Sequence, residues 1–180
     1  MNNRPAPQLV FLIELCSRLV DADGHVDLYE YCFLRILSIN LQQATDPSAT
    51  GRHRRAPKRE VRAAALNLLR LLAAYGHSDP AEREQAFAAG IKEMPPWAEG
   101  ARFEASPELS IELLNHSLDL LATLNEAGRG TVIRAVSAIA SHDGEITSRE
   151  AALIRAACAT LELPLPPILV KNDGPATAPA

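Results

Sequence analysis

The sequence predicts an all-α protein of about seven helices, arranged as two related halves. Its composition supports this, because 47% of the 180 residues are hydrophobic while only 4% are aromatic. Most of the apolar residues are Ala and Leu, which favour helices, and few β-branched or aromatic runs are available for a sheet. Apolar residues also recur three and four positions apart, and a helix–Asp-Gly–helix pattern occurs twice.

The predicted helices follow one another from residue 7 to residue 161. Their approximate ranges are 7–20, 28–43, 58–75, 79–89, 107–124, 126–142 and 147–161. The fourth helix has the clearest ends, because Asp79 is a suitable N-cap, Pro80 suits the first helical position and Gly90 is expected as the C-cap. The main irregular connection covers residues 94–106.

These helices are expected to form one domain over residues 1–170, since a chain of this length can bury a core of its own. The two repeat units cover about residues 8–45 and 126–162. Residues 171–180, rich in Pro and Ala, are expected to be a disordered tail.

The repeated element reads Asp-Gly-x-[Val/Ile]-x-x-x-Glu, and each shared residue has a structural use. In the second unit Gly144 suits the left-handed C′ position that ends a helix, and Ile146 is an apolar plug before the next helix. Thr147–Glu150 then forms a capping box. The counterparts in the first unit are Gly24, Val26 and Asp27–Glu30.

The same element has a second interpretation as a cation site. Asp21, Asp23 and Glu30 match the third, fifth and twelfth positions of an EF-hand loop, which collects oxygen ligands around a hard cation. The first ligand position is Leu19, which cannot coordinate a metal. Capping is therefore the favoured interpretation, and divalent-cation binding is the alternative.

A basic segment between the second and third helices is the other candidate site. The chain carries a net charge of −4, so this cluster stands out from an otherwise acidic protein. Its cationic residues are Arg52, Arg54, Arg55, Lys58, Arg59 and Arg62. They favour contact with a phosphate, an anionic membrane surface or an acidic protein. No aromatic residue is interleaved with them, so no nucleic-acid partner is expected.

The order of several motifs resembles a known family. Paired helix–Asp-Gly–helix units are typical of tellurite-resistance TerB-like domains, which are all-helical. The runs Ala22–Glu30, Gly76–Pro80, Ala86–Gly90 and Leu163–Pro167 further resemble the C-terminal region of bacterial HtpX-like zinc metallopeptidases. The resemblance covers about residues 8–170. It implies metal binding through acidic turn residues, here Asp21, Asp23, Glu30, Asp143, Glu145 and Glu150.

In that family the peptidase chemistry belongs to an upstream membrane-associated domain with an H-E-x-x-H motif, and this sequence contains no such motif. We therefore expect no enzyme activity and no required cofactor. The resemblance implies that the partner is the peptidase domain of a parent protein, whether this chain is a fragment or free-standing. Another protein or an anionic membrane surface is the alternative partner. The expected location is the cytoplasm, either free or tethered through an upstream domain.

Other chemistry-bearing residues have simpler structural explanations. Cys16, Cys32 and Cys158 lie among apolar residues without metal-ligand spacing and are expected to be reduced core residues. His77-Ser78-Asp79 contains the residue types of a hydrolase triad, but adjacent residues cannot form one, so a turn and an N-cap are expected. Trp97 is expected to fill the gap between the two halves.

Overall fold

The computed structural model describes residues 28–45, 56–104, 111–144 and 146–167. These residues form six α-helices and no β-strand, which confirms the predicted all-α class. The elements are α2 (Leu28–Thr45), α3 (Lys58–Gly76), α4 (Pro80–Lys92), the 3₁₀ turn η2 (Pro96–Ala98), α5 (Ile111–Ala122), α6 (Glu126–Ala140) and α7 (Ser148–Thr160). The helix expected at 7–20, the first Asp-Gly turn and the tail at 171–180 lie outside the described residues.

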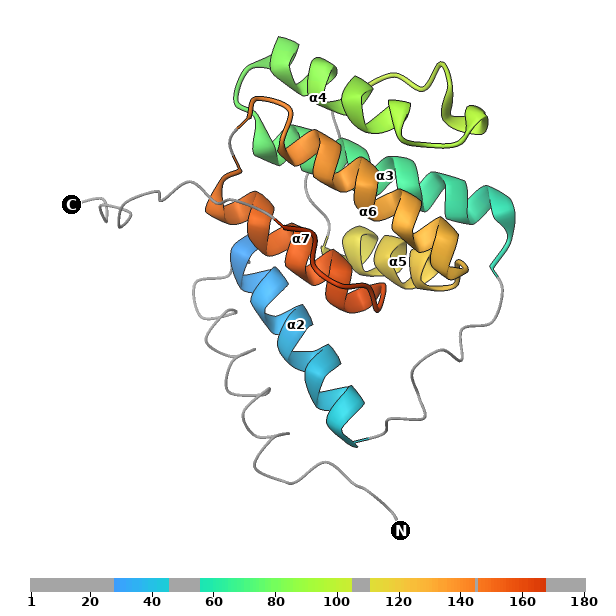
Figure 1. Cartoon of the computed structure of the whole chain (residues 1–180), viewed down its shortest axis with the longest axis vertical. Coiled ribbons are helices and arrows are strands. Elements are labelled where there is room, and N and C mark those ends of the chain that lie inside the picture. The colour runs from blue at the N-terminus through green and yellow to red at the C-terminus, as the bar shows by residue number, and fades with distance from the viewer. Residues whose placement is uncertain (1–27, 46–55, 105–110, 145, 168–180) are drawn as a thin grey trace, which may run out of the picture.

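Helix α3 is at the centre of the arrangement. It packs against α4, α5, α6 and α7, while α4 also packs on α6, and α2 packs on α7 (Figure 1). In the view of Figure 1, α4 and α2 lie at opposite ends of the stack, with α3, α6, α5 and α7 between them. No helix in the described part of the chain is long and apolar enough to cross a bilayer.

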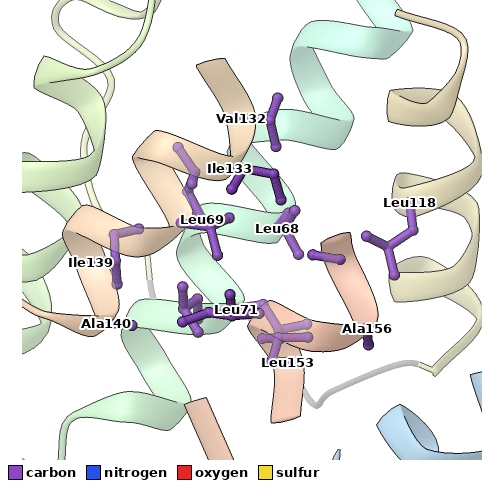
Figure 2. Close-up of a cluster of buried hydrophobic side chains, with 14 of the residues drawn as sticks. Leu68, Leu69, Leu71, Leu118, Val132, Ile133, Ile139, Ala140, Leu153 and Ala156 are labelled. Carbon is purple, nitrogen blue, oxygen red and sulfur yellow. The ribbon is translucent and has the colours of Figure 1, made fainter. Parts of the chain in front are cut away.

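The core is mainly aliphatic, and the central helices contribute most of its side chains (Figure 2), with Phe87 of α4 and Tyr31 of α2 as its aromatic members. Leu69 of α3, Leu118 of α5, Ile139 of α6 and Leu153 of α7 are all fully buried. Burying one such side chain contributes about 1.5–3 kcal/mol of favourable transfer free energy. The apolar residues three and four positions apart, which predicted these helices, mark the helix faces that are buried in the bundle.

The helix ends agree with the sequence in most places. Asp79 accepts a hydrogen bond from the backbone N–H of Ala81 (3.4 Å) and caps α4, with Pro80 at its first position, as predicted. The predicted C-cap at Gly90 is wrong, because α4 continues to Lys92. Gly90 instead lies buried where α4 crosses α6, where its lack of a side chain allows the two helices to approach closely.

A polar network fastens α2 to two other helices. The Arg35 guanidinium donates to Asn115 Oδ1 (3.1 Å) and Asp119 on α5, and to Thr160 Oγ1 (3.3 Å) on α7. The Tyr31 hydroxyl donates to the same Asn115 oxygen at 2.8 Å. Burial raises the pKa of the Tyr31 hydroxyl above its ordinary value, so this group remains a donor across the physiological pH range.

Two of the three cysteines lie within the described residues. Cys32 and Cys158 are buried and form no disulfide, which confirms them as core residues. Burial raises the pKa of the Cys158 thiol to about 11, so the reactive thiolate is scarce at neutral pH. Cys16 lies outside the described residues.

Candidate functional site

The first candidate site is a group of three cations at the start of α3, which we call the α3 cationic face. It consists of Lys58, Arg59 and Arg62, and all three are exposed. Residues three and four positions apart lie on one side of a helix, so Arg62 is next to both of the others on the helix surface. The remaining predicted contact residues, Arg52, Arg54 and Arg55, lie outside the described residues.

At the beginning of α3, little negative charge balances the partial positive charge of the helix N-terminus. The N-cap is Pro57, which makes no side-chain hydrogen bond to the first turn, and its carbonyl accepts from the N–H groups of Glu60 (3.0 Å) and Val61 (3.1 Å). A helix N-terminus carries a partial positive charge, so cationic side chains are unfavourable there and anions are favourable. Glu60 is the one acidic residue in the first turn. This end of the helix is therefore electrostatically suited to an anionic partner.

Trp97 supports one of these cations. Its ring lies in η2, partly buried against the core, and the Arg62 guanidinium lies over the ring with its Cζ 5.2 Å from the ring centroid. Such a cation–π contact contributes about 0.5–1 kcal/mol at an exposed site. From the sequence, Trp97 is expected to fill the gap between the two halves, and its pairing with Arg62 is not predicted, because the two residues are far apart in the chain and no local pattern connects them.

The second candidate site is the Asp-Gly turn between α6 and α7, and the predicted capping box at the start of α7 is confirmed. Gly144 has a φ of +83°, and Ile146 is buried before α7. Thr147 accepts from the N–H of Glu150, whose Oε2 in turn accepts from the Thr147 N–H (2.9 Å) and hydroxyl (2.8 Å). The predicted C′ position of Gly144 is wrong, because the C-cap of α6 is Ser141 and Gly144 follows it by three residues.

The other Glu150 oxygen has a different environment. Oε1 is buried without a hydrogen-bond partner and faces Gly76 at the end of α3. Beside it, His77 is buried, and its Nε2 donates to the carbonyl oxygen of Ile139 at 3.3 Å. The His142 ring meets the His77 ring edge-on, with centroids 6.1 Å apart. Three helix ends, those of α3, α6 and α7, therefore converge on polar side chains.

Desolvation is the main influence on the Glu150 carboxyl. Burial raises the pKa of Glu150 above its ordinary value of 4.5. The hydrogen bonds from Thr147 and a positive charge on His77 act in the opposite direction, and the nearby Asp143 carboxylate raises the pKa further. The sequence predicts Glu150 as a cap, but the unpaired state of its second oxygen could not be predicted, because it depends on the packing of α3.

The candidate metal ligands that the structure describes lie in different environments. Asp21, Asp23 and Glu145 lie outside the described residues. Of the other three, Glu30 is half-buried in the first turn of α2, Asp143 is exposed in the turn, and Glu150 completes the capping box. Among the residues for which the structure gives positions, no three His, Cys, Asp or Glu side chains are grouped so that they could hold a metal ion.

The His77-Ser78-Asp79 run forms a turn, as expected. His77 is the C-cap of α3 and Asp79 is the N-cap of α4. Arg83 closes the turn by donating to the carbonyl oxygens of His77 (2.7 Å) and Ser78 (3.2 Å). These contacts assign the three residues to the connection between the two helices.

Comparison of the chain with protein-family models, with curated proteins and with solved structures gave no match.

Proposed function

We propose that this protein is a non-catalytic helical accessory domain that binds an acidic partner through the α3 cationic face. The observation that carries the proposal is the exposure of Lys58, Arg59 and Arg62 together at a helix N-terminus without a side-chain cap. Their mutual repulsion and the helix dipole disfavour this arrangement in the isolated domain. An anionic surface near these side chains reduces both the repulsion among the cations and their unfavourable interaction with the helix dipole. Both reductions make binding more favourable.

The contact between Arg62 and Trp97 restricts the Arg62 side chain to a conformation that is available for binding. Because the aromatic ring supports the guanidinium, less side-chain entropy is lost when an anion is bound. The planar guanidinium matches a carboxylate or phosphate with two parallel hydrogen bonds. Together these properties favour a partner that presents several acidic groups.

The resemblance to the C-terminal region of HtpX-like metallopeptidases suggests which partner to test first. It points to the peptidase domain of a parent protein, with another acidic protein as the second choice. An anionic membrane surface is the third choice, because each Lys or Arg near such a surface contributes about 1 kcal/mol. Only the first choice depends on the resemblance, since acidic proteins and anionic membranes are also favoured by charge alone.

Binding can be tested with two probes, a poly-glutamate peptide and vesicles containing phosphatidylserine. The variant Lys58→Ala/Arg59→Ala/Arg62→Ala should bind the preferred probe about 100-fold more weakly, because three contributions of about 1 kcal/mol are lost. The loss should shrink at high salt, where exposed charges are screened. A second variant with Arg52, Arg54, Arg55, Lys58 and Arg59 changed to Ala measures the contribution of the preceding segment.

The matched control changes three exposed cations on other parts of the surface, Lys92, Arg102 and Arg155, to Ala. It has the same net charge as the triple variant, so equal weakening of binding by both would show a non-specific charge effect. Peptide binding without vesicle binding would assign the face to a protein partner, and the reverse result would assign it to a membrane. Binding to neither probe would contradict the proposal.

The alternative function, a divalent-metal-binding module, makes a separate prediction. Calorimetric titration with calcium, magnesium and zinc would then release or absorb heat, and the ion would raise the melting temperature. The accessory-domain proposal expects neither effect. Loss of a metal response in Glu150→Gln would place the ion at the Asp-Gly turn.

A further inference from the structure

The segment that follows α7 is rich in proline and has no regular secondary structure. Residues 163–167 read Leu-Pro-Leu-Pro-Pro. The Leu163 N–H donates to the Cys158 carbonyl oxygen (3.0 Å), and the Leu163 side chain packs, partly buried, against the core. The proline-rich segment therefore starts from a fixed point at the end of α7.

The prolines restrict the backbone of this segment to an extended form. A proline ring fixes φ at about −65° and removes the backbone N–H, so Leu165 supplies the only N–H group of residues 164–167. No backbone hydrogen bond links these four residues to any other described residue, and no described peptide bond is cis. These properties match a polyproline II helix, which has a φ of about −75° and no internal hydrogen bonds.

Solvent exposure along the segment follows the threefold repeat of a polyproline II helix. Pro164 and Pro167 are exposed, and Leu165 is 46% exposed. Leu163 and Pro166 are half-buried. Because this helix has three residues per turn, residues three positions apart lie on the same edge. One edge, with Leu163 and Pro166, is thus the less exposed one, and the other two edges face solvent.

The exposed edges are suited to bind in a groove of another protein. Their proline rings and leucine side chain present apolar surface to water, and burying that surface is favourable. Because the prolines have already fixed the backbone, little conformational entropy is lost on binding. Pro164 and Pro167 have the P-x-x-P spacing that aromatic-lined grooves bind in a polyproline II conformation.

We propose that residues 164–167 are a docking segment for a partner protein whose aromatic-lined groove binds polyproline II ligands. The two exposed edges, which carry Pro164, Leu165 and Pro167, enter the groove, and the edge of Pro166 stays toward the domain. The anchored Leu163 keeps the bound partner next to the helix bundle. Residues 163–167 carry no charge, so this docking segment acts separately from the α3 cationic face.

Binding is tested by calorimetric titration of the full chain with two probes that bind proline-rich ligands, an SH3 domain and a WW domain. The unchanged protein should bind one of them, and a proline-rich peptide that fills the groove of that probe should compete. Pro164→Ala/Pro167→Ala should bind at least about tenfold more weakly, because both rings on one exposed edge are lost. Binding by neither probe contradicts the proposal.

The matched control is Pro166→Ala, the same residue change on the less exposed edge. It should cause a smaller loss of affinity, which comes only from the freer backbone. A loss as large as that of the double variant would show that the exposed edge is not what the probe recognises, and would overturn the proposal.

The triple variant Lys58→Ala/Arg59→Ala/Arg62→Ala should bind the probe as tightly as the unchanged protein. If it also loses binding, the contact belongs to the α3 cationic face and the docking segment is rejected.

The conformation of the segment can be measured without any partner. The three-bond coupling between the amide and Hα protons of Leu165 reports the φ of that residue. We expect a φ of about −75°, as in a polyproline II helix. A φ of about −140°, as in an antiparallel β-strand, would contradict the proposed docking conformation.

Discussion

Replacing glycine by alanine is expected to change stability in opposite directions at two positions of this protein, depending on which atoms lie next to the glycine. A Cβ at Gly90 would lie 2.6 Å from Ile139 Cγ1 and 3.1 Å from the carbonyl oxygen of Ala135. A Cβ at Gly130 would meet nothing closer than Arg134 at 3.8 Å. Both glycines are inside α-helices, where Ala is intrinsically favoured by about 1 kcal/mol.

We expect Gly90→Ala to lower the free energy of unfolding by about 1–3 kcal/mol, because overpacking between α4 and α6 exceeds the gain in helix propensity. Gly130→Ala should raise it by up to about 1 kcal/mol. Urea unfolding of the two variants measures both changes. A stabilised Gly90→Ala would show that α4 does not cross α6 this closely, and partial rescue by Ile139→Val would support the contact.

The two ends of α7 depend on different kinds of interaction. The first end is defined by residues close together in the chain, and the last end also depends on a contact with another helix. Its start is the capping box of Thr147 and Glu150, which the sequence pattern predicts. Its end is a Schellman motif, in which the N–H of Leu163 donates to the Cys158 carbonyl (3.0 Å). The left-handed position of that motif holds Glu162, with a φ of +53°, where glycine is usual.

Glu162 is explained by its pairing with Arg129 of α6 at 3.3 Å, where both side chains are largely buried. Glu162→Ala should destabilise the protein by about 1–2 kcal/mol, since it loses the ion pair and keeps the strained backbone. Glu162→Gly should be more stable than Glu162→Ala by about 0.5–1 kcal/mol, because the strain is relieved. Thermal unfolding distinguishes the two, and the opposite order would contradict this account of the helix end.

At the scale of the whole molecule, α2 is joined to the bundle by a network that the repeat did not predict. Arg35 and Arg155 occupy matching positions in the two repeat units. Arg35 is largely buried between α5 and α7, whereas Arg155 is exposed on α7. Similarly, Phe33 is 55% exposed while its counterpart Leu153 is fully buried. The two units therefore use similar sequences in different environments.

We expect Arg35→Ala to destabilise the protein by about 2–3 kcal/mol, because one buried, one half-buried and one exposed acceptor lose a charged donor. Hydrogen exchange should show the loss of protection concentrated in α2. Arg155→Ala is the matched control and should change stability by less than about 0.5 kcal/mol. Equal effects of the two substitutions would mean that the network does not anchor α2.

Much of the fold could be predicted from local pattern. Apolar spacing located α3, α6 and α7 to within a few residues, and Asp79 and Thr147 marked helix starts, because capping depends on neighbours in the chain. The prediction of a C-cap at Gly90 was wrong because it depends on residues distant in the chain. In the sequence, a glycine that ends a helix cannot be distinguished from one that allows a neighbouring helix to pack closely. The candidate sites were predicted less completely, because only composition and charge were visible.

By itself, the sequence determined the all-α class, the positions of most described helices, the capping role of Glu150 and the cluster of cations before and within α3. Those properties follow from residues close together in the chain. The tertiary structure alone decided that Arg62 rests on Trp97, that Arg35 joins three helices, and that a Glu150 oxygen faces Gly76 unpaired. Each depends on contacts between residues far apart in sequence, which only the packing of whole helices brings together.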